Sequence, residues 1–61
     1  MFRFRCDFYN YFTESEGFFL IVIDTNSVPM SEKDVFLEAM SRAYALCNGP
    51  KKFISLTFIS C

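Results

Sequence analysis

Few side chains in this chain of 61 residues have acid–base or nucleophilic chemistry. Histidine is absent, so proton transfer or nucleophilic attack would have to come from carboxylates, lysine or cysteine. The three cysteines, Cys6, Cys47 and Cys61, form no C-x-x-C pair, whereas a structural zinc site needs four Cys or His ligands at short paired spacings. We therefore expect no metal and no other cofactor.

Two features come nearest to an active site. Asp7 and Asp24 would lie opposite each other in one hairpin register, where they could form a carboxylate dyad, but two solvated acids at strand ends are the simpler interpretation. Cys47 fits a small core residue and Cys61 an exposed thiol, and nothing near them in sequence would activate a thiolate. Each of the two glycines fits a turn, so no phosphate-binding loop is indicated. The sequence predicts a protein that is not an enzyme.

Charge and composition narrow the possible partners and the compartment. Six basic and seven acidic residues give a formal charge of −1, which offers no electrostatic reason to expect nucleic acid. An odd number of cysteines without a secretory signal favours reduced thiols and a cytoplasmic location. The longest apolar run, Phe18–Ile23, is far shorter than the roughly 20 residues that cross a bilayer, so no membrane is expected as a partner.

The pattern of residues predicts one domain, residues 1–61, with the element order β-β-α-β. Apolar even positions alternate with polar or tyrosine odd positions over 2–12, which indicates a strand with one buried face, and Asn10 suggests a bulge. A turn over 13–17, ending at Gly17, leads into a strand over 18–24 that is apolar on both faces.

A helix over 32–47 follows the polar loop 24–29. Ser31 is the expected N-cap, an apolar stripe at spacings of three and four runs from Val35 to Cys47, and Asn48-Gly49-Pro50 ends the helix. Alternation then predicts a third strand over 53–59. The expected fold is an α+β domain in which one helix packs on one face of a three-stranded sheet.

Two sheet orders are compatible with this element order. We favour 1-2-3, because a strand that is apolar on both faces belongs in the middle, and a crossover helix would then set the third strand parallel to the second. The alternative is 2-1-3, with the third strand antiparallel to the first. Pairing of Thr13 with Phe18 would place Phe8 opposite Ile23, and a loop one residue different would exchange the faces of the second strand.

One helix can cover only one face of such a sheet. The other face of strand 18–24 would carry either Phe19, Ile21 and Ile23 or Phe18, Leu20 and Val22, and an apolar patch of that size normally marks an interface. We therefore expect a homodimer that packs either face to face or edge to edge. The expected self-association residues are Tyr9, Tyr11, Phe19, Ile21 and Ile23.

The functional expectation is a small protein-binding protein of an inhibitory or accessory kind. Phage-encoded inhibitors of host enzymes have this size, an association that would place the chain in a host cytoplasm. Its partner would bind the polar loops and helix face, at Glu14, Glu16, Asp24, Asn26, Glu38 and Arg42. The alternative is a single-stranded nucleic-acid-binding protein in which Tyr9 and Tyr11 stack on bases, assisted by Arg3, Arg5, Lys51 and Lys52.

Overall fold

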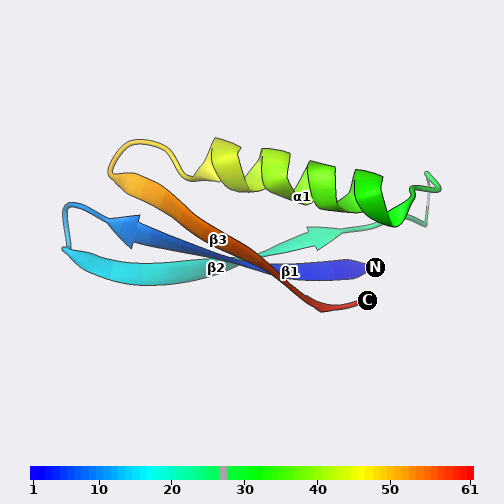
Figure 1. The fold of residues 1–61 in the computed structure, drawn as a ribbon, viewed down its shortest axis with the longest axis horizontal. Helices are drawn as coiled ribbons and strands as arrows, with labels where there is room; N and C mark the ends of the chain where they lie inside the picture. The colour runs from blue at the N-terminus through cyan, green and yellow to red at the C-terminus, as the bar shows by residue number, and fades with distance from the viewer. Residues whose placement is uncertain (27) are drawn as a thin grey trace.

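One α-helix lies along one face of a three-stranded antiparallel sheet (Figure 1). The computed structural model describes residues 1–26 and 28–61, so Ser27 of the predicted loop 24–29 lies outside the described residues. The elements in chain order are β1 (Phe2–Asn10), β2 (Ser15–Ile23), α1 (Glu32–Leu46) and β3 (Lys51–Ser60). The predicted α+β class and the β-β-α-β order are confirmed.

The boundaries of the elements differ most from prediction at the hairpin. β1 ends two residues before the predicted Phe12, because the Asn10 side chain accepts hydrogen bonds from the backbone N–H groups of Phe12 and Thr13, at 2.9 and 3.3 Å. Such a side-chain bond starts a turn. Glu14, with φ of 53°, completes it. Asn10 therefore begins the turn instead of forming the predicted bulge.

Gly17 has a different role from the predicted one. It lies inside β2, opposite Phe8, and a Cβ atom at this position would be 2.9 Å from Cζ of the Phe8 ring. Glycine therefore allows the Phe8 ring to lie directly over the backbone of β2. The positive φ that the turn requires is at Glu14 instead.

The hairpin register, which the sequence left open, differs from the one in which Thr13 would pair with Phe18. Phe8 pairs with Gly17, six residues before the expected Ile23. Because side chains alternate with a period of two, an even shift leaves every side chain on its original face. Asp7 now lies opposite Phe18 and not opposite Asp24, so the possible carboxylate dyad does not form.

The order of strands is β2-β1-β3, so the favoured order 1-2-3 is wrong and the alternative 2-1-3 is confirmed. β3 is antiparallel to β1 and hence runs in the direction of β2, with β1 between them. The central position suits β1 because Phe58 of β3 packs against its Phe4, with ring centroids 5.6 Å apart. On the other face Asp7 accepts a hydrogen bond from Ser55, at 3.4 Å.

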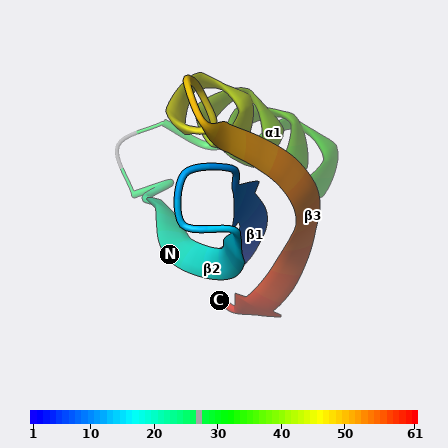
Figure 2. The ribbon, with the colours of Figure 1, turned by 90° about the vertical axis from the view of Figure 1, so that its left-hand side faces the viewer.

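The core lies between α1 and the sheet. Ala39 and Ala43 of the predicted helix stripe are fully buried, and their small side chains allow α1 to approach the strands closely. The predicted N-cap is confirmed, since Ser31 Oγ accepts from the backbone N–H of Asp34 at 3.2 Å. Figure 2 shows α1 above the sheet and β3 curving from the helix side to the opposite side. The buried core comprises Phe4, Cys6, Ile21, Ile23, Val35, Ala39 and Ala43.

Candidate interaction surface

The sheet has an open face, which is the face turned away from α1. Cross-strand pairing arranges its side chains in three parallel rows, one on each strand. β2 contributes the apolar row, β1 a charged row and β3 a hydroxyl row. The apolar row is Phe18, Leu20 and Val22, the charged row is Arg3, Arg5 and Asp7, and the hydroxyl row is Ser55, Thr57 and Ser60.

The charges in the middle of the open face compensate one another. Arg5 forms an ion pair with Asp7, with Nη2 3.0 Å from Oδ1, and its guanidinium carbon lies 4.1 Å from the centre of the Phe18 ring. Ser55 Oγ donates a hydrogen bond to the second oxygen of Asp7. Cation–π stacking and a carboxylate partner are the interactions that suit a planar guanidinium. The middle of the open face is therefore polar and satisfied within the chain.

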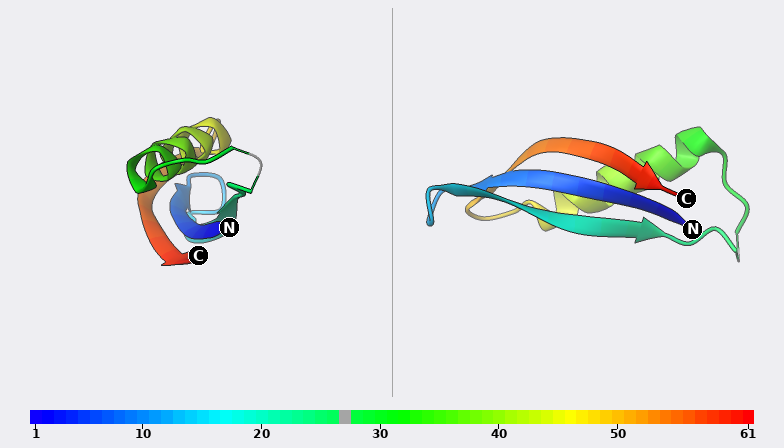
Figure 3. Two further views of the ribbon diagram at one scale, coloured as in Figure 1. Left: turned by 90° about the vertical axis from the view of Figure 1, so that its right-hand side faces the viewer. Right: turned by 90° about the horizontal axis from the view of Figure 1, so that it is seen from below.

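The apolar row belongs to β2, which lies at an edge of the sheet (Figure 3). Phe18, Leu20 and Val22 are 55, 59 and 42% exposed. The Val22 carbonyl accepts a hydrogen bond from Nη1 of Arg42 on the helix, at 2.9 Å, so it points away from β1. Because backbone direction alternates along a strand, the backbone groups of Phe18 and Leu20 also point outward. Within residues 1–26 and 28–61, β2 thus presents exposed apolar side chains together with backbone groups that point away from β1 and have no backbone partner, which is the arrangement that pairs with another strand.

The predicted self-association residues are divided between the two faces. Ile21 and Ile23 are 4 and 2% exposed, because α1 covers the face to which they belong. Phe19, on that same face, is half-buried and packs on the Phe8 ring. The other set considered for this strand, the apolar row, is the exposed one. Tyr9 is half-buried on the open face, and Tyr11 in the turn contacts it with ring centroids 5.2 Å apart.

The six predicted partner-binding residues form two clusters. Near the end of β2, Arg42 binds both Glu38, at 3.2 Å, and the Val22 carbonyl, while Asp24 accepts a hydrogen bond from the Asn26 backbone at 2.9 Å. Glu14 and Glu16 lie at the hairpin end instead. A nine-residue strand spans about 30 Å, so the two clusters cannot form one site on a single copy.

The residues of the nucleic-acid alternative are also separated. Arg3, Arg5 and Lys52 share the open face, whereas Lys51 extends over the Phe8 ring on the helix side, 5.2 Å from its centroid. Arg5 is already paired with Asp7, which leaves Arg3 and Lys52 at opposite ends of the pairing with β1. These four cations do not form a continuous basic stripe.

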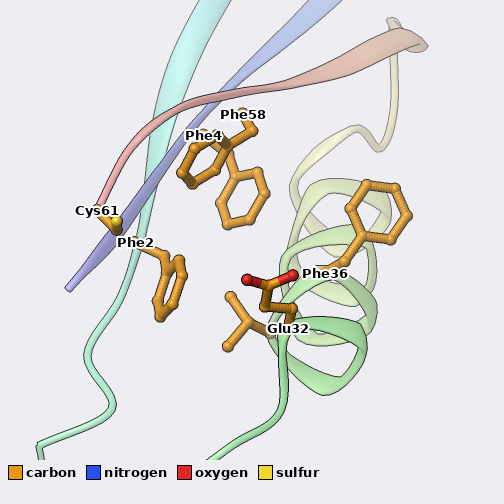
Figure 4. Close-up of a pocket in the computed structure, with 7 residues that line it drawn as sticks. Phe2, Phe4, Glu32, Phe36, Phe58 and Cys61 are labelled. Atoms are coloured by element: carbon orange, nitrogen blue, oxygen red, sulfur yellow. The ribbon is translucent and has the colours of Figure 1, made fainter.

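An apolar groove of about 340 Å³ opens between the first turns of α1 and the ends of β1 and β3 (Figure 4). Phe36 and Phe58, two of its walls, remain about half exposed. The sequence pattern placed Phe36 and Phe58 on stripes that were expected to face the core. A chain with nine phenylalanines, one helix and three strands has more aromatic side chains than its core can bury, and this excess was the signal for an exposed aromatic groove. The lining residues are Phe2, Phe4, Glu32, Val35, Phe36, Phe58 and Cys61.

Two cysteines from distant parts of the chain meet at the core. The Sγ atoms of Cys6 in β1 and Cys47 at the C-cap of α1 are 3.9 Å apart. Cys6 is fully buried and Cys47 is half-buried. Burial, followed by the effects of the neighbouring Cys47 and Asp7, raises the pKa of the Cys6 thiol to about 12. Sequence reasoning missed this pair, because their proximity depends on how the helix end packs on β1.

Metal-binding clusters, membrane-spanning helices and similarity to known proteins were the three remaining sources of a functional assignment. Among the described residues, no three His, Cys, Asp or Glu side chains gather closely enough to hold a metal ion. No helix in the described part of the chain is long and apolar enough to cross a membrane. No family model, no curated protein and no solved structure matches this chain.

Proposed function

We propose that this chain is a non-catalytic protein-binding protein that acts as a homodimer, with an inhibitory or accessory effect on a second protein. The observation that supports this proposal is the apolar row on the free edge of β2. Setting two such rows side by side buries part of each side chain, and each Å² of apolar surface removed from water contributes about 25 cal/mol. Three such side chains per copy, on a nine-residue strand with a free edge, supply a substantial driving force for association.

Edge-to-edge pairing suits the open face better than face-to-face packing. Face-to-face packing would bury the Arg5–Asp7 ion pair, and removing such charges from water costs several kcal/mol per ion. Pairing of two β2 edges leaves that pair hydrated. An antiparallel arrangement with two-fold symmetry about Phe19 sets Phe18 of each copy opposite Leu20 of the other and joins the two apolar rows. Because the Val22 carbonyl already accepts a hydrogen bond from Arg42, the pairing between copies is centred on Phe18, Phe19 and Leu20.

A second protein would bind the surfaces that this dimer leaves free. The dimer repeats the two polar clusters at the ends of β2, which carry Glu14, Glu16 and Asp24, and these acidic groups favour a basic target surface. Occlusion of that target is the proposed effect, in a host cytoplasm if the chain is viral. The nucleic-acid alternative has less support, since the central cation of the open face, Arg5, is neutralised by Asp7.

Sedimentation equilibrium over a dilution series tests the proposal. One chain has a mass of 7.1 kDa, and the expected result is twice that mass at high concentration, falling toward the mass of a single chain on dilution. The same preparation, mixed with labelled single-stranded oligonucleotide at low salt, should show no binding. The mass of a single chain at every concentration, or salt-dependent oligonucleotide binding, would contradict the proposal.

A further inference from the structure

We propose that Cys6 and Cys47 are a disulfide-forming pair, and that small organic disulfides such as oxidised glutathione are the oxidant that closes it. The two Sγ atoms are 3.9 Å apart, and a disulfide bond requires about 2.05 Å, so an approach of about 1.9 Å is needed. The proposal is independent of the function proposed above.

The position of Cys47 allows that approach. Cys47 is the C-cap of α1, with ψ of 71°, so it has already left the helical conformation and lies where the chain turns toward β3. One backbone hydrogen bond, from its N–H to the carbonyl of Ala43, connects it to the last turn. Cys6 lies in the middle of the central strand, where both neighbouring strands fix its backbone. Cys47 and the C-terminal end of α1 therefore move toward Cys6 when the bond forms.

The difference in exposure sets the order of the two steps. Cys47 is half-buried and reachable from solvent, whereas Cys6 is fully buried. The Cys47 thiolate attacks one sulfur of the small disulfide, forms a mixed disulfide and releases one small thiol. Cys6, after losing its proton to solvent, then attacks the Cys47 sulfur and displaces the second small thiol. In total, two protein thiols and one small disulfide yield the Cys6–Cys47 bond and two small thiols.

The second step is the slow one. Burial raises the pKa of Cys6 to about 12, so little of it is thiolate at neutral pH, and the charged group nearest to it is Asp7. The mixed disulfide at Cys47 should therefore accumulate before it is resolved. The bond would close a loop that contains the hairpin and the whole of α1, and a loop of this length raises the Tm of a small domain by more than about 10 °C.

The experiment uses the Cys61→Ser variant, which removes the exposed third thiol. Incubation with oxidised glutathione and mass spectrometry should show addition of one glutathione, followed by its loss, and a final product two hydrogens lighter than the reduced chain. Peptide mapping should join Cys6 to Cys47. The Tm of the product should exceed that of the reduced protein, and a dithiol reductant should reverse the difference.

Two further variants keep the test decisive. In Cys61→Ser with Cys47→Ala, the folded chain should take up no glutathione, because Cys6 is fully buried, and in Cys61→Ser with Cys6→Ala the glutathione adduct on Cys47 should persist. Circular dichroism confirms that each variant is folded before oxidation. Persistence of the adduct in Cys61→Ser itself, or formation of only intermolecular disulfides, would overturn the proposal.

Discussion

Replacing Ile23 with alanine is expected to lower the free energy of unfolding by about 2–5 kcal/mol, whereas Val22→Ala should lower it by less than about 1 kcal/mol. The two residues are neighbours in β2, but Ile23 is 2% exposed beneath α1 and Val22 belongs to the open face. A domain of this size has a stability of about 3–9 kcal/mol, so the first variant loses a large part of its stability.

Chemical denaturation of the two variants measures this difference. If Ile23→Ala does not fold, Ile23→Val provides a milder substitution, with an expected loss of about 0.5–1.5 kcal/mol. Equal losses for Val22→Ala and Ile23→Ala would mean that both faces of β2 are buried. A larger loss for Val22→Ala would mean that α1 covers the opposite face.

Leu20→Glu is expected to convert the dimer to a monomer with little effect on the stability of the single chain. Leu20 of each copy lies at the proposed seam beside Phe18 of the other copy, so the dimer loses the apolar contacts of two leucines and places a carboxylate within each joined apolar row, and we expect dimer affinity to fall by at least about 10-fold. Within one chain Leu20 lies beside Arg5 on the exposed open face, where a carboxylate has a favourable cross-strand partner.

Thr57→Glu is the matched control for this variant. Thr57 also pairs with Arg5, from the β3 side, and lies on the same open face, so it places the same charge beside the same arginine away from the β2 edge. Light scattering should give the mass of two chains for Thr57→Glu and the mass of one chain for Leu20→Glu. Dissociation by both variants would favour face-to-face packing, and dissociation by neither would place the interface elsewhere.

The sequence predicted the helix better than any other element. Its N-cap at Ser31 was confirmed, and its start and end are correct to within one residue, because capping and a stripe at spacings of three and four are local properties. The register of the hairpin was left open by the sequence, because a strand that is apolar on both faces does not favour one face over the other. The turn that begins at Asn10 shortens β1, so Phe8 pairs with Gly17, six residues before Ile23. An even shift of this kind leaves each side chain on the same face of the sheet.

The sheet order could not be predicted from how apolar each strand is. The run Phe18–Ile23 suggested a strand with neighbours on both sides, but β2 is an edge strand whose second face stays exposed. The deciding contacts are made by β3, through the packing of Phe58 on Phe4 and the hydrogen bond of Ser55 to Asp7. These contacts join residues about 50 positions apart and leave no local signal in the sequence.

From the sequence, the exposed face of strand 18–24 could be predicted only as one of two sets of side chains, Phe19, Ile21 and Ile23 or Phe18, Leu20 and Val22. The imbalance between one helix and a strand that is apolar on both faces correctly indicated that one face would stay uncovered. Which face this is depends on where α1 docks, and α1 docks over Ile21 and Ile23 because Ala39 and Ala43 permit close approach there. The free edge of β2 became visible only once the order of strands was known.

Amide hydrogen exchange at Leu20, measured at protein concentrations below and above the dimer transition, tests the central claim most directly. The Leu20 backbone points away from β1, so its amide should exchange rapidly in the monomer and become protected in the dimer, together with that of Phe18. The Ile21 amide, which points toward β1, should be protected at both concentrations. Exchange at Leu20 that is equally rapid at every concentration, in a protein that still sediments with the mass of two chains, would contradict edge pairing through β2.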